Sequence, residues 1–216
     1  MYRLGVLISG RGSNFHSILK NIQSGFIKNA EIVVVVSDKS NAKGLEIAKE
    51  NNIDAIFLDS QGMDRETYDK IIAEKLREYN VDYVVLAGFM RILSSYFINE
   101  FKNRIINIHP ALLPSFKGLH AQRQAIEKGV RFSGATVHFV TDELDDGPII
   151  MQSVVPVFEN DTEEELSERI LKTEHKIYPL SIKLITENRI KIVNGKVVSN
   201  IKGIDDDFYI INPKGI

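Results

Sequence analysis

The chain has 216 residues, of which 44% are hydrophobic and 26% are charged, and it carries a formal net charge of −2 and no cysteine. This composition is typical of a soluble globular protein with a sizeable core. It excludes disulfides and thiolate metal sites, and it argues against a dedicated nucleic-acid binder. The sequence shows no signal-peptide cleavage region and no membrane-spanning segment, so we expect a cytoplasmic protein with neither nucleic-acid nor membrane partners.

Short apolar runs rich in β-branched residues alternate with helical patterns through the first half of the chain. The expected strands cover residues 4–8, 32–36, 55–58, 83–87 and 105–109, and the expected helices cover 14–24, 43–51, 65–79 and 94–101. An uninterrupted apolar strand is typical of burial on both faces. The alternation predicts an α/β fold with a doubly wound, mostly parallel sheet.

The second half predicts an antiparallel carboxy-terminal part. A helix is expected at 121–128, followed by antiparallel strands at 134–140 and 149–157, a long helix at 162–187, and short strands at 190–193 and 196–199. Thr162 and Glu165 form a capping box, whereas Pro179 predicts a kink or a break in the long helix. Asn194 and Gly195 indicate a type I′ hairpin. The chain shows no long linker, so we expect one domain.

A candidate catalytic pair ends the expected strand 105–109. Asn107 and His109 are two residues apart and share a face, and Pro110 should end the strand there. Open parallel sheets bind their ligands at the carboxyl ends of strands. A histidine beside a carboxylate can polarise a carbonyl or move protons near neutral pH. A purely structural role for His109 is the alternative.

The carboxylate that would serve His109 is harder to choose. Asp145 is the candidate, but the same acidic stretch contains Asp142, Glu143 and Asp146. Sequence spacing alone brings none of them to His109, and Asp145 could equally be a turn residue. The alternatives therefore stay open at this point.

Two further segments are candidates for ligand binding. Residues 10–14, GRGSN, join the first strand to the first helix and suit a phosphate, although a plain turn with Ser13 or Asn14 as a helix cap fits equally well. Residues 86–93, LAGFMRIL, could line a flat apolar slot, with core packing as the alternative. The five histidines form no tight metal-ligand pair, and no G-x-S-x-G elbow indicates a serine hydrolase.

Six segments in one order, at residues 8–14, 86–93, 107–114, 118–120, 138–141 and 142–148, together resemble the phosphoribosylglycinamide formyltransferase family of folate-dependent formyltransferases. Residues 174–179 extend the match, which leaves out only the tail. The resemblance implies a Rossmann-like formyltransferase fold in one domain, 1–216. Its nucleotide- and phosphate-binding half would be 1–109, its folate-binding half 110–200, and its tail 201–216.

The resemblance also implies the reaction. The formyl group of 10-formyltetrahydrofolate, a cosubstrate, would pass to the amine of glycinamide ribonucleotide in purine biosynthesis, without a metal, in a monomer or a homodimer. The matching catalytic positions are Asn107, His109 and Asp145. The matching ribonucleotide positions are Gly12, Ser13, Asn14 and Glu174, and the folate positions are Arg65, Met90, Arg91, Ile92, Leu93, Val140, Thr141 and Leu144.

Three alternatives compete with this interpretation. A methionyl-tRNA formyltransferase should have a further carboxy-terminal RNA-binding domain, and a formyltetrahydrofolate deformylase should have an extra amino-terminal domain. A non-catalytic nucleotide-binding module should not retain Asn107, His109 and Asp145 together. In this chain Asp146 follows Asp145, where some relatives have a glycine, which makes the loop more acidic.

Overall fold

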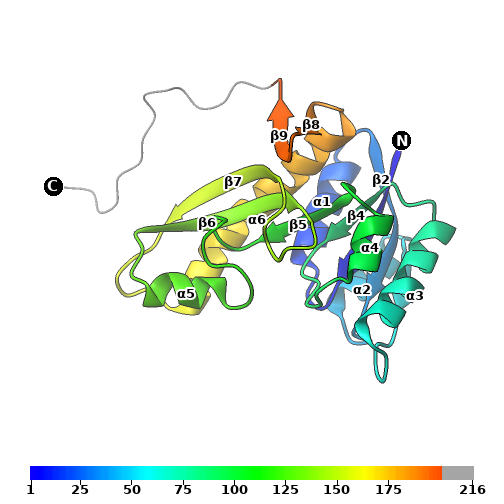
Figure 1. The fold of residues 1–216 in the computed structure, drawn as a ribbon, viewed down its shortest axis with the longest axis horizontal. Coiled ribbons are helices and arrows are strands. Elements are labelled where there is room, and N and C mark those ends of the chain that lie inside the picture. Colours follow the sequence, from blue (N-terminus) through cyan, green and yellow to red (C-terminus); the bar gives the residue numbers. More distant parts are fainter. Residues whose placement is uncertain (201–216) are drawn as a thin grey trace.

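The computed structural model describes residues 1–200, and the expected tail at 201–216 lies outside the described residues. A seven-stranded sheet forms the centre of the fold (Figure 1). In the spatial order β3-β2-β1-β4-β5-β6-β7, its strands are β3 (Asp54–Phe57), β2 (Ala30–Ser37), β1 (Tyr2–Ile8), β4 (Tyr83–Leu86), β5 (Ile105–His109), β6 (Phe132–Phe139) and β7 (Ile149–Pro156). Strands β1 to β5 are parallel, whereas β6 and β7 are antiparallel to their neighbours. The predicted mostly parallel sheet with an antiparallel part is confirmed.

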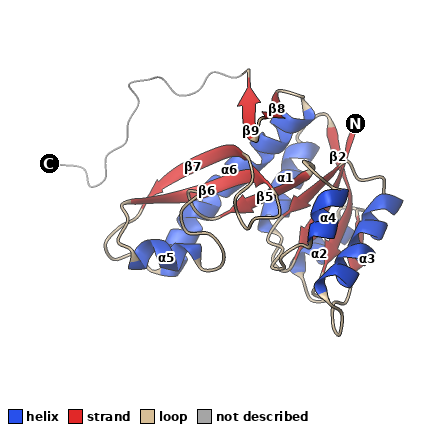
Figure 2. Cartoon of the chain, viewed as in Figure 1, coloured by secondary structure: helices blue, strands red, loops and turns tan. Residues whose placement is uncertain are grey.

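Helices cover both faces of this sheet (Figure 2). One face packs against α1 (Ser13–Gln23), α2 (Lys43–Glu50), α5 (Ala121–Glu127) and α6 (Glu163–Thr186), and the other against α3 (Arg65–Glu78) and α4 (Ser95–Glu100). The apolar run of strand β1 is uninterrupted because both faces of the strand are buried. Leu4 and Val6 join the first cluster and Leu7 joins the second, so alternate side chains enter different cores.

The strand order places a crevice beside β1 and β4. Strand β1 is followed by a crossover to β2 on one side, and β4 by a crossover to β5 on the other. The loops after β1 and β4 therefore diverge, which is where doubly wound sheets bind ligands. Two hydrogen bonds join these loops: Ser9 N donates to Gly88 O at 2.9 Å, and Met90 N donates to Ser9 Oγ at 2.9 Å.

The structure confirms two local predictions in the carboxy-terminal part. Thr162 and Glu165 form the capping box of α6. Strands β8 (Ile190–Val193) and β9 (Lys196–Ser199) form an antiparallel hairpin. Its turn residues Asn194 and Gly195 have φ values of 50° and 73°, as a type I′ turn requires.

Of the kink or break predicted at Pro179, the break is wrong, because α6 runs through this residue without interruption. A proline in a helix has no N–H for the carbonyl four residues before it, which here belongs to His175. Ser17 of α1 supplies the missing donor, since its Oγ donates to His175 O at 2.9 Å. The proline therefore leaves an acceptor on α6 that docks α1.

We expect Ser17→Ala to lower the free energy of unfolding by about 1 kcal/mol, because the partly buried His175 carbonyl loses its donor. The variant Pro179→Ala restores a backbone N–H to this carbonyl, so the same serine substitution should cost less in that background. Urea unfolding of the four proteins measures the difference. Equal costs in both backgrounds would contradict the proposed compensation.

Candidate active site

The end of β5 presents two polar side chains on one face of the sheet. Ile106 and Ile108 pack into the core that includes α6, so the alternating residues Asn107 and His109 face the other way. His109 is buried, and Asn107 lies opposite His138 in the pairing of β5 with β6. The amide nitrogen of Asn107 lies 3.2 Å from Nε2 of His138.

Asp145 reaches this pair from the loop between β6 and β7. Its Oδ2 lies 3.4 Å from Nδ1 of His109 and accepts a hydrogen bond from Gly118 N at 2.9 Å. The Asp145 side chain is only 9% exposed, whereas the other three acidic residues of the loop, Asp142, Glu143 and Asp146, are exposed. The structure therefore brings Asp145 to His109 and separates it from its acidic neighbours.

Asp146 has a different partner. It forms an ion pair with Lys117, and this hydrogen bond holds the pKa of the Asp146 carboxyl below its usual value. The pair lies at the surface, where charges are screened by solvent. Lys117 precedes Gly118, so the acidic loop contacts the segment after β5 through both aspartates.

A backbone carbonyl completes the surroundings of His109. Nε2 of His109 lies 2.8 Å from Phe116 O, while Nδ1 faces Asp145. Carbonyl and carboxylate oxygens only accept hydrogen bonds, so the ring satisfies both partners when both nitrogens carry hydrogen. The arrangement suits a positively charged His109. Phe116, with φ of 56°, was missed by the sequence analysis because a backbone carbonyl leaves no mark on residue identity.

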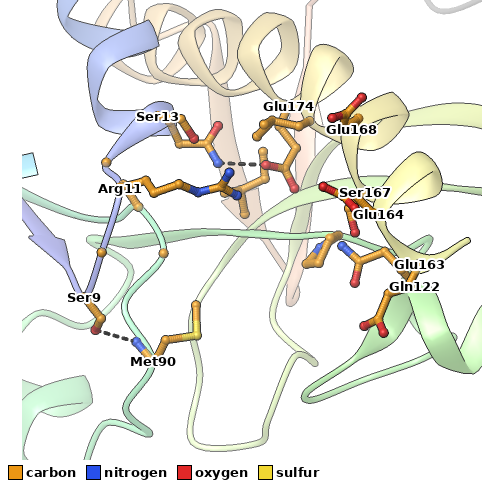
Figure 3. A pocket seen from close by; sticks show the side chains of 18 residues that line it. Ser9, Arg11, Ser13, Met90, Gln122, Glu163, Glu164, Ser167, Glu168 and Glu174 are labelled. Atoms are coloured by element: carbon orange, nitrogen blue, oxygen red, sulfur yellow. Dashed lines mark hydrogen bonds between the residues drawn. The ribbon is translucent and has the colours of Figure 1, made fainter. Parts of the chain in front are cut away.

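A cleft of about 710 Å³ lies between the loop after β1 and the amino-terminal half of α6. Arg11 and Ser13 face the glutamates of α6 across it (Figure 3). No side chain caps α1, because its N-cap is Gly12 with φ of 70°. The alternative in which Ser13 or Asn14 caps this helix is therefore wrong. A Cβ on Gly12 would lie 2.8 Å from the Gly44 Cα, so close packing also requires glycine here.

Two buried polar side chains form the floor of this first cleft. Asn14 Nδ2 donates to Glu174 Oε2 at 2.7 Å, and both residues are buried and line the cleft. Burial raises the pKa of the Glu174 carboxyl, and the Asn14 hydrogen bond offsets this in part. The buried Oδ1 of Asn14 has no partner among residues 1–200. This floor therefore offers an acceptor to a ligand that carries hydroxyl or amine donors.

A second cleft of about 460 Å³ lies on the other side of the β5 end. Its lining includes the catalytic candidates Asn107, His109 and Asp145 and the folate candidates Met90, Arg91, Ile92, Leu93, Val140, Thr141 and Leu144. Met90 is 66% exposed and Leu144 50%, so core packing does not explain them. Arg65 begins α3 and is not among the residues that line either cleft.

Arg91 has a fixed place at the edge of the second cleft. Its guanidinium lies 4.6 Å from the ring centre of Tyr68, and it donates to Ser60 Oγ at 3.0 Å. The backbone after it is also held, because Ser94 N donates to the buried carboxylate of Asp69 at 2.5 Å. The later part of the loop after β4 is thus held in place by Ser60 and by Tyr68 and Asp69 of α3.

The two clefts meet at the end of β5. Ile108 and Pro110 line both, while Asn107 and His109 line the second. A group held in one cleft can therefore approach a group held in the other, beside an amide, an imidazole and a carboxylate. Residues 1–200 contain no cluster of three or more histidine and acidic side chains suited to a metal ion. Within the same residues, no helix has the length and apolar character needed to cross a membrane.

Comparison with known proteins gives the family. Residues 2–182 match the formyl transferase family model, and the chain therefore belongs to this family. It is 46% identical to phosphoribosylglycinamide formyltransferase of Escherichia coli K12, over 87% of this chain and 88% of that protein. Glycinamide ribonucleotide transformylase 1 from Symbiobacterium toebii has a similar structure, with a TM-score of 0.89 and 48% identity over 92% of this chain and 94% of that one.

A formyltetrahydrofolate deformylase from Pseudomonas syringae also has a similar structure, with a TM-score of 0.86 and 28% identity. The match covers 92% of this chain but only 65% of that one. The fold is thus shared with an enzyme that carries a different name. Its chain extends beyond the matched part, whereas the phosphoribosylglycinamide formyltransferase of Escherichia coli is covered over 88% of its length.

The buried Glu174 carboxyl makes the stability of the protein depend on pH. Because its pKa is higher in the folded than in the unfolded chain, its ionisation lowers stability as the pH rises above the unfolded value of 4.5. Glu174→Gln keeps an oxygen for Asn14 but removes the charge. We expect a higher free energy of unfolding than wild type at pH 7, with the gain shrinking towards pH 4.

Urea unfolding at the two pH values measures this gain. Glu164→Gln is the matched control, because this glutamate lines the same cleft but is exposed, and its substitution should leave stability nearly unchanged. A Glu174→Gln variant that is less stable than wild type at pH 7 would contradict the prediction.

Proposed function

We propose that this chain transfers the formyl group of 10-formyltetrahydrofolate to the amine of glycinamide ribonucleotide. The products are formylglycinamide ribonucleotide and tetrahydrofolate, as in de novo purine biosynthesis. The observation that carries the proposal is the meeting of two clefts at the end of β5, beside Asn107, His109 and Asp145. The full-length relatives with 46% and 48% identity support the choice of acceptor.

The first cleft suits the ribonucleotide. A phosphate at the start of α1 would receive backbone N–H groups and the positive end of the helix dipole, with Gly12, Ser13 and Asn14 around it. Glu174 and the free Oδ1 of Asn14 would accept hydrogen bonds from the sugar or the amide. The amine end of the substrate would then extend towards β5.

The second cleft suits the folate. Met90, Ile92 and Leu144 are apolar side chains that stay exposed at its edge, and a flat ring system would cover them. Val140, Thr141 and Leu93 line the same cleft. Arg91, and less directly Arg65, would attract the acidic tail of the folate. Formyl-folate acts here as a cosubstrate, and the proposed reaction needs no metal.

The chemistry follows from the positions of three side chains. The amine attacks the formyl carbon, and the carbonyl oxygen becomes an oxyanion. Asn107 Nδ2 and protonated His109 Nε2 would donate hydrogen bonds to it. Asp145 stabilises the positive charge on His109 from the Nδ1 side. The bond from carbon to the folate nitrogen then breaks, and a proton lost by the amine is delivered to that nitrogen.

This mechanism requires one local change. Phe116 O lies 2.8 Å from the Nε2 atom that would serve the oxyanion. An oxyanion is a stronger acceptor than a neutral carbonyl, so it can replace Phe116 as the partner of Nε2. The segment that carries Phe116 therefore has to move when both substrates are bound.

The acceptor can be tested directly. We expect the absorbance change of formyl-folate conversion to require glycinamide ribonucleotide, and formylglycinamide ribonucleotide to accumulate in equal amount. Water is the acceptor if tetrahydrofolate forms equally fast without the ribonucleotide, as in a deformylase. No turnover under either condition would favour a nucleotide-binding module. Transfer to methionyl-tRNA instead would identify another amine acceptor.

A further inference from the structure

His138 has no role in the mechanism above, although it is buried beside the proposed catalytic amide. It lies on β6 directly opposite Asn107, is 1% exposed, and lines the second cleft. Its two ring nitrogens have different partners. Nδ1 lies 3.0 Å from Phe139 O, and Nε2 lies 3.2 Å from Asn107 Nδ2.

These partners select one tautomer of the His138 ring. A carbonyl oxygen only accepts, so Nδ1 must carry the hydrogen that it shares with Phe139. Burial lowers the pKa of His138, which keeps the ring neutral at pH 7. In a neutral ring protonated at Nδ1, Nε2 is a bare acceptor. Asn107 can face this acceptor only with its NH₂ group, because its oxygen would be repelled.

We propose that His138 is a positioning residue that fixes the carboxamide of Asn107 with its nitrogen held at Nε2. One amide hydrogen is used in this contact, and the second stays available to a ligand in the cleft that both residues line. The inference rests on the proposed function in one respect, since it makes this second hydrogen the donor to the oxyanion. The orientation itself follows from the contacts of His138 alone.

Protonation of His138 would undo the arrangement. Nε2 would then become a donor, Asn107 would have to present its oxygen instead, and no amide hydrogen would be fixed by this contact. Oδ1 of Asp145 lies 3.8 Å from Nε2 of His138, so a charged His138 ring would compete with His109 for the Asp145 carboxylate. The Asp145 charge and the Phe139 carbonyl favour protonation, whereas burial, His109 and Lys117 oppose it.

The tautomer can be measured without any assay of activity. Nitrogen-15 NMR of the wild-type protein at pH 7 should show a protonated Nδ1 and an unprotonated Nε2 for His138, with His138→Gln used to assign the signals among the five histidines. A ring protonated at Nε2, or at both nitrogens, would overturn the proposal whatever the reaction of the protein is.

A pair of variants tests the effect on the reaction. His138→Leu removes the acceptor, and we expect kcat to fall about 10- to 100-fold while the ribonucleotide KM changes little. His138→Gln can place a carbonyl oxygen near the position of Nε2, so it should recover most of this loss. A folded His138→Leu protein with wild-type kcat, or a glutamine variant no better than leucine, would contradict the proposal.

A double-variant cycle tests whether His138 affects kcat through the side chain of Asn107. In an Asn107→Ala background, His138→Leu should cause no further loss of kcat, because the amide that it positions is absent. Val137→Ala is the matched control: Val137 is buried on the same strand but pairs with Ile108, so any effect should multiply with that of Asn107→Ala. If the losses of kcat caused by His138→Leu and Asn107→Ala multiply in the double variant, the proposal is also overturned.

The NMR measurement and the Asn107→Ala variant together separate the positioning role of His138 from the proposed function on which it partly rests. If Asn107→Ala turns over like wild type, the role of Asn107 in the proposed function fails. The NMR result still decides whether His138 orients the amide. If Asn107→Ala is impaired but the His138 tautomer is reversed, the function stands and the positioning role fails.

Discussion

The site depends on one largely buried carboxylate that connects three segments of the chain. Asp145 lies 3.4 Å from Nδ1 of His109 at the end of β5 and accepts a hydrogen bond from Gly118 N at 2.9 Å in the segment after it. Its own backbone has φ of 49°, in the left-handed region that aspartate tolerates better than most residues. A buried charge is costly unless it is paired, so this carboxylate requires both contacts. The orientation of His109 follows from it.

The sheet explains how these segments come together. The doubly wound order opens a crevice beyond β1 and β4, and β5 extends the carboxyl edge with Asn107 and His109. The reversal of direction at β6 then places His138 opposite Asn107, and the β6–β7 loop returns Asp145 to His109. Alternation along β5 separates the apolar side chains beneath α6 from the polar pair. Residues of the parallel and the antiparallel parts thus line both clefts together, and the antiparallel part adds His138 and Asp145 to the polar site.

Much of this could be predicted from sequence because the signals are local. Uninterrupted apolar runs indicated the buried strands, and the spacing of Asn107 and His109 before Pro110 placed both on one face at a strand end. The remaining features depend on distant contacts. Asp145 could not be separated from Asp142 and Asp146 by spacing, since burial distinguishes them and burial is a property of the fold.

Backbone partners were also invisible in the sequence. The carbonyl of Phe116 and the N–H of Gly118 contact the site, yet any residue with that backbone could provide them. Pro179 failed to break α6 for a similar reason. Its effect is compensated by Ser17, a residue 158 positions before the carbonyl that it serves. A rule about proline in helices cannot include a donor from another helix.

Asp145, and not its acidic neighbours, is expected to support His109 during formyl transfer. The most direct measurement compares the single-turnover rate of formyl transfer in Asp145→Asn, Asp142→Asn and Asp146→Asn with that of wild type. We expect a large loss of rate, on the order of 100-fold, in Asp145→Asn alone, because only this substitution removes the charge beside His109. Similar rates in all three variants, or a larger loss in either neighbour, would contradict it.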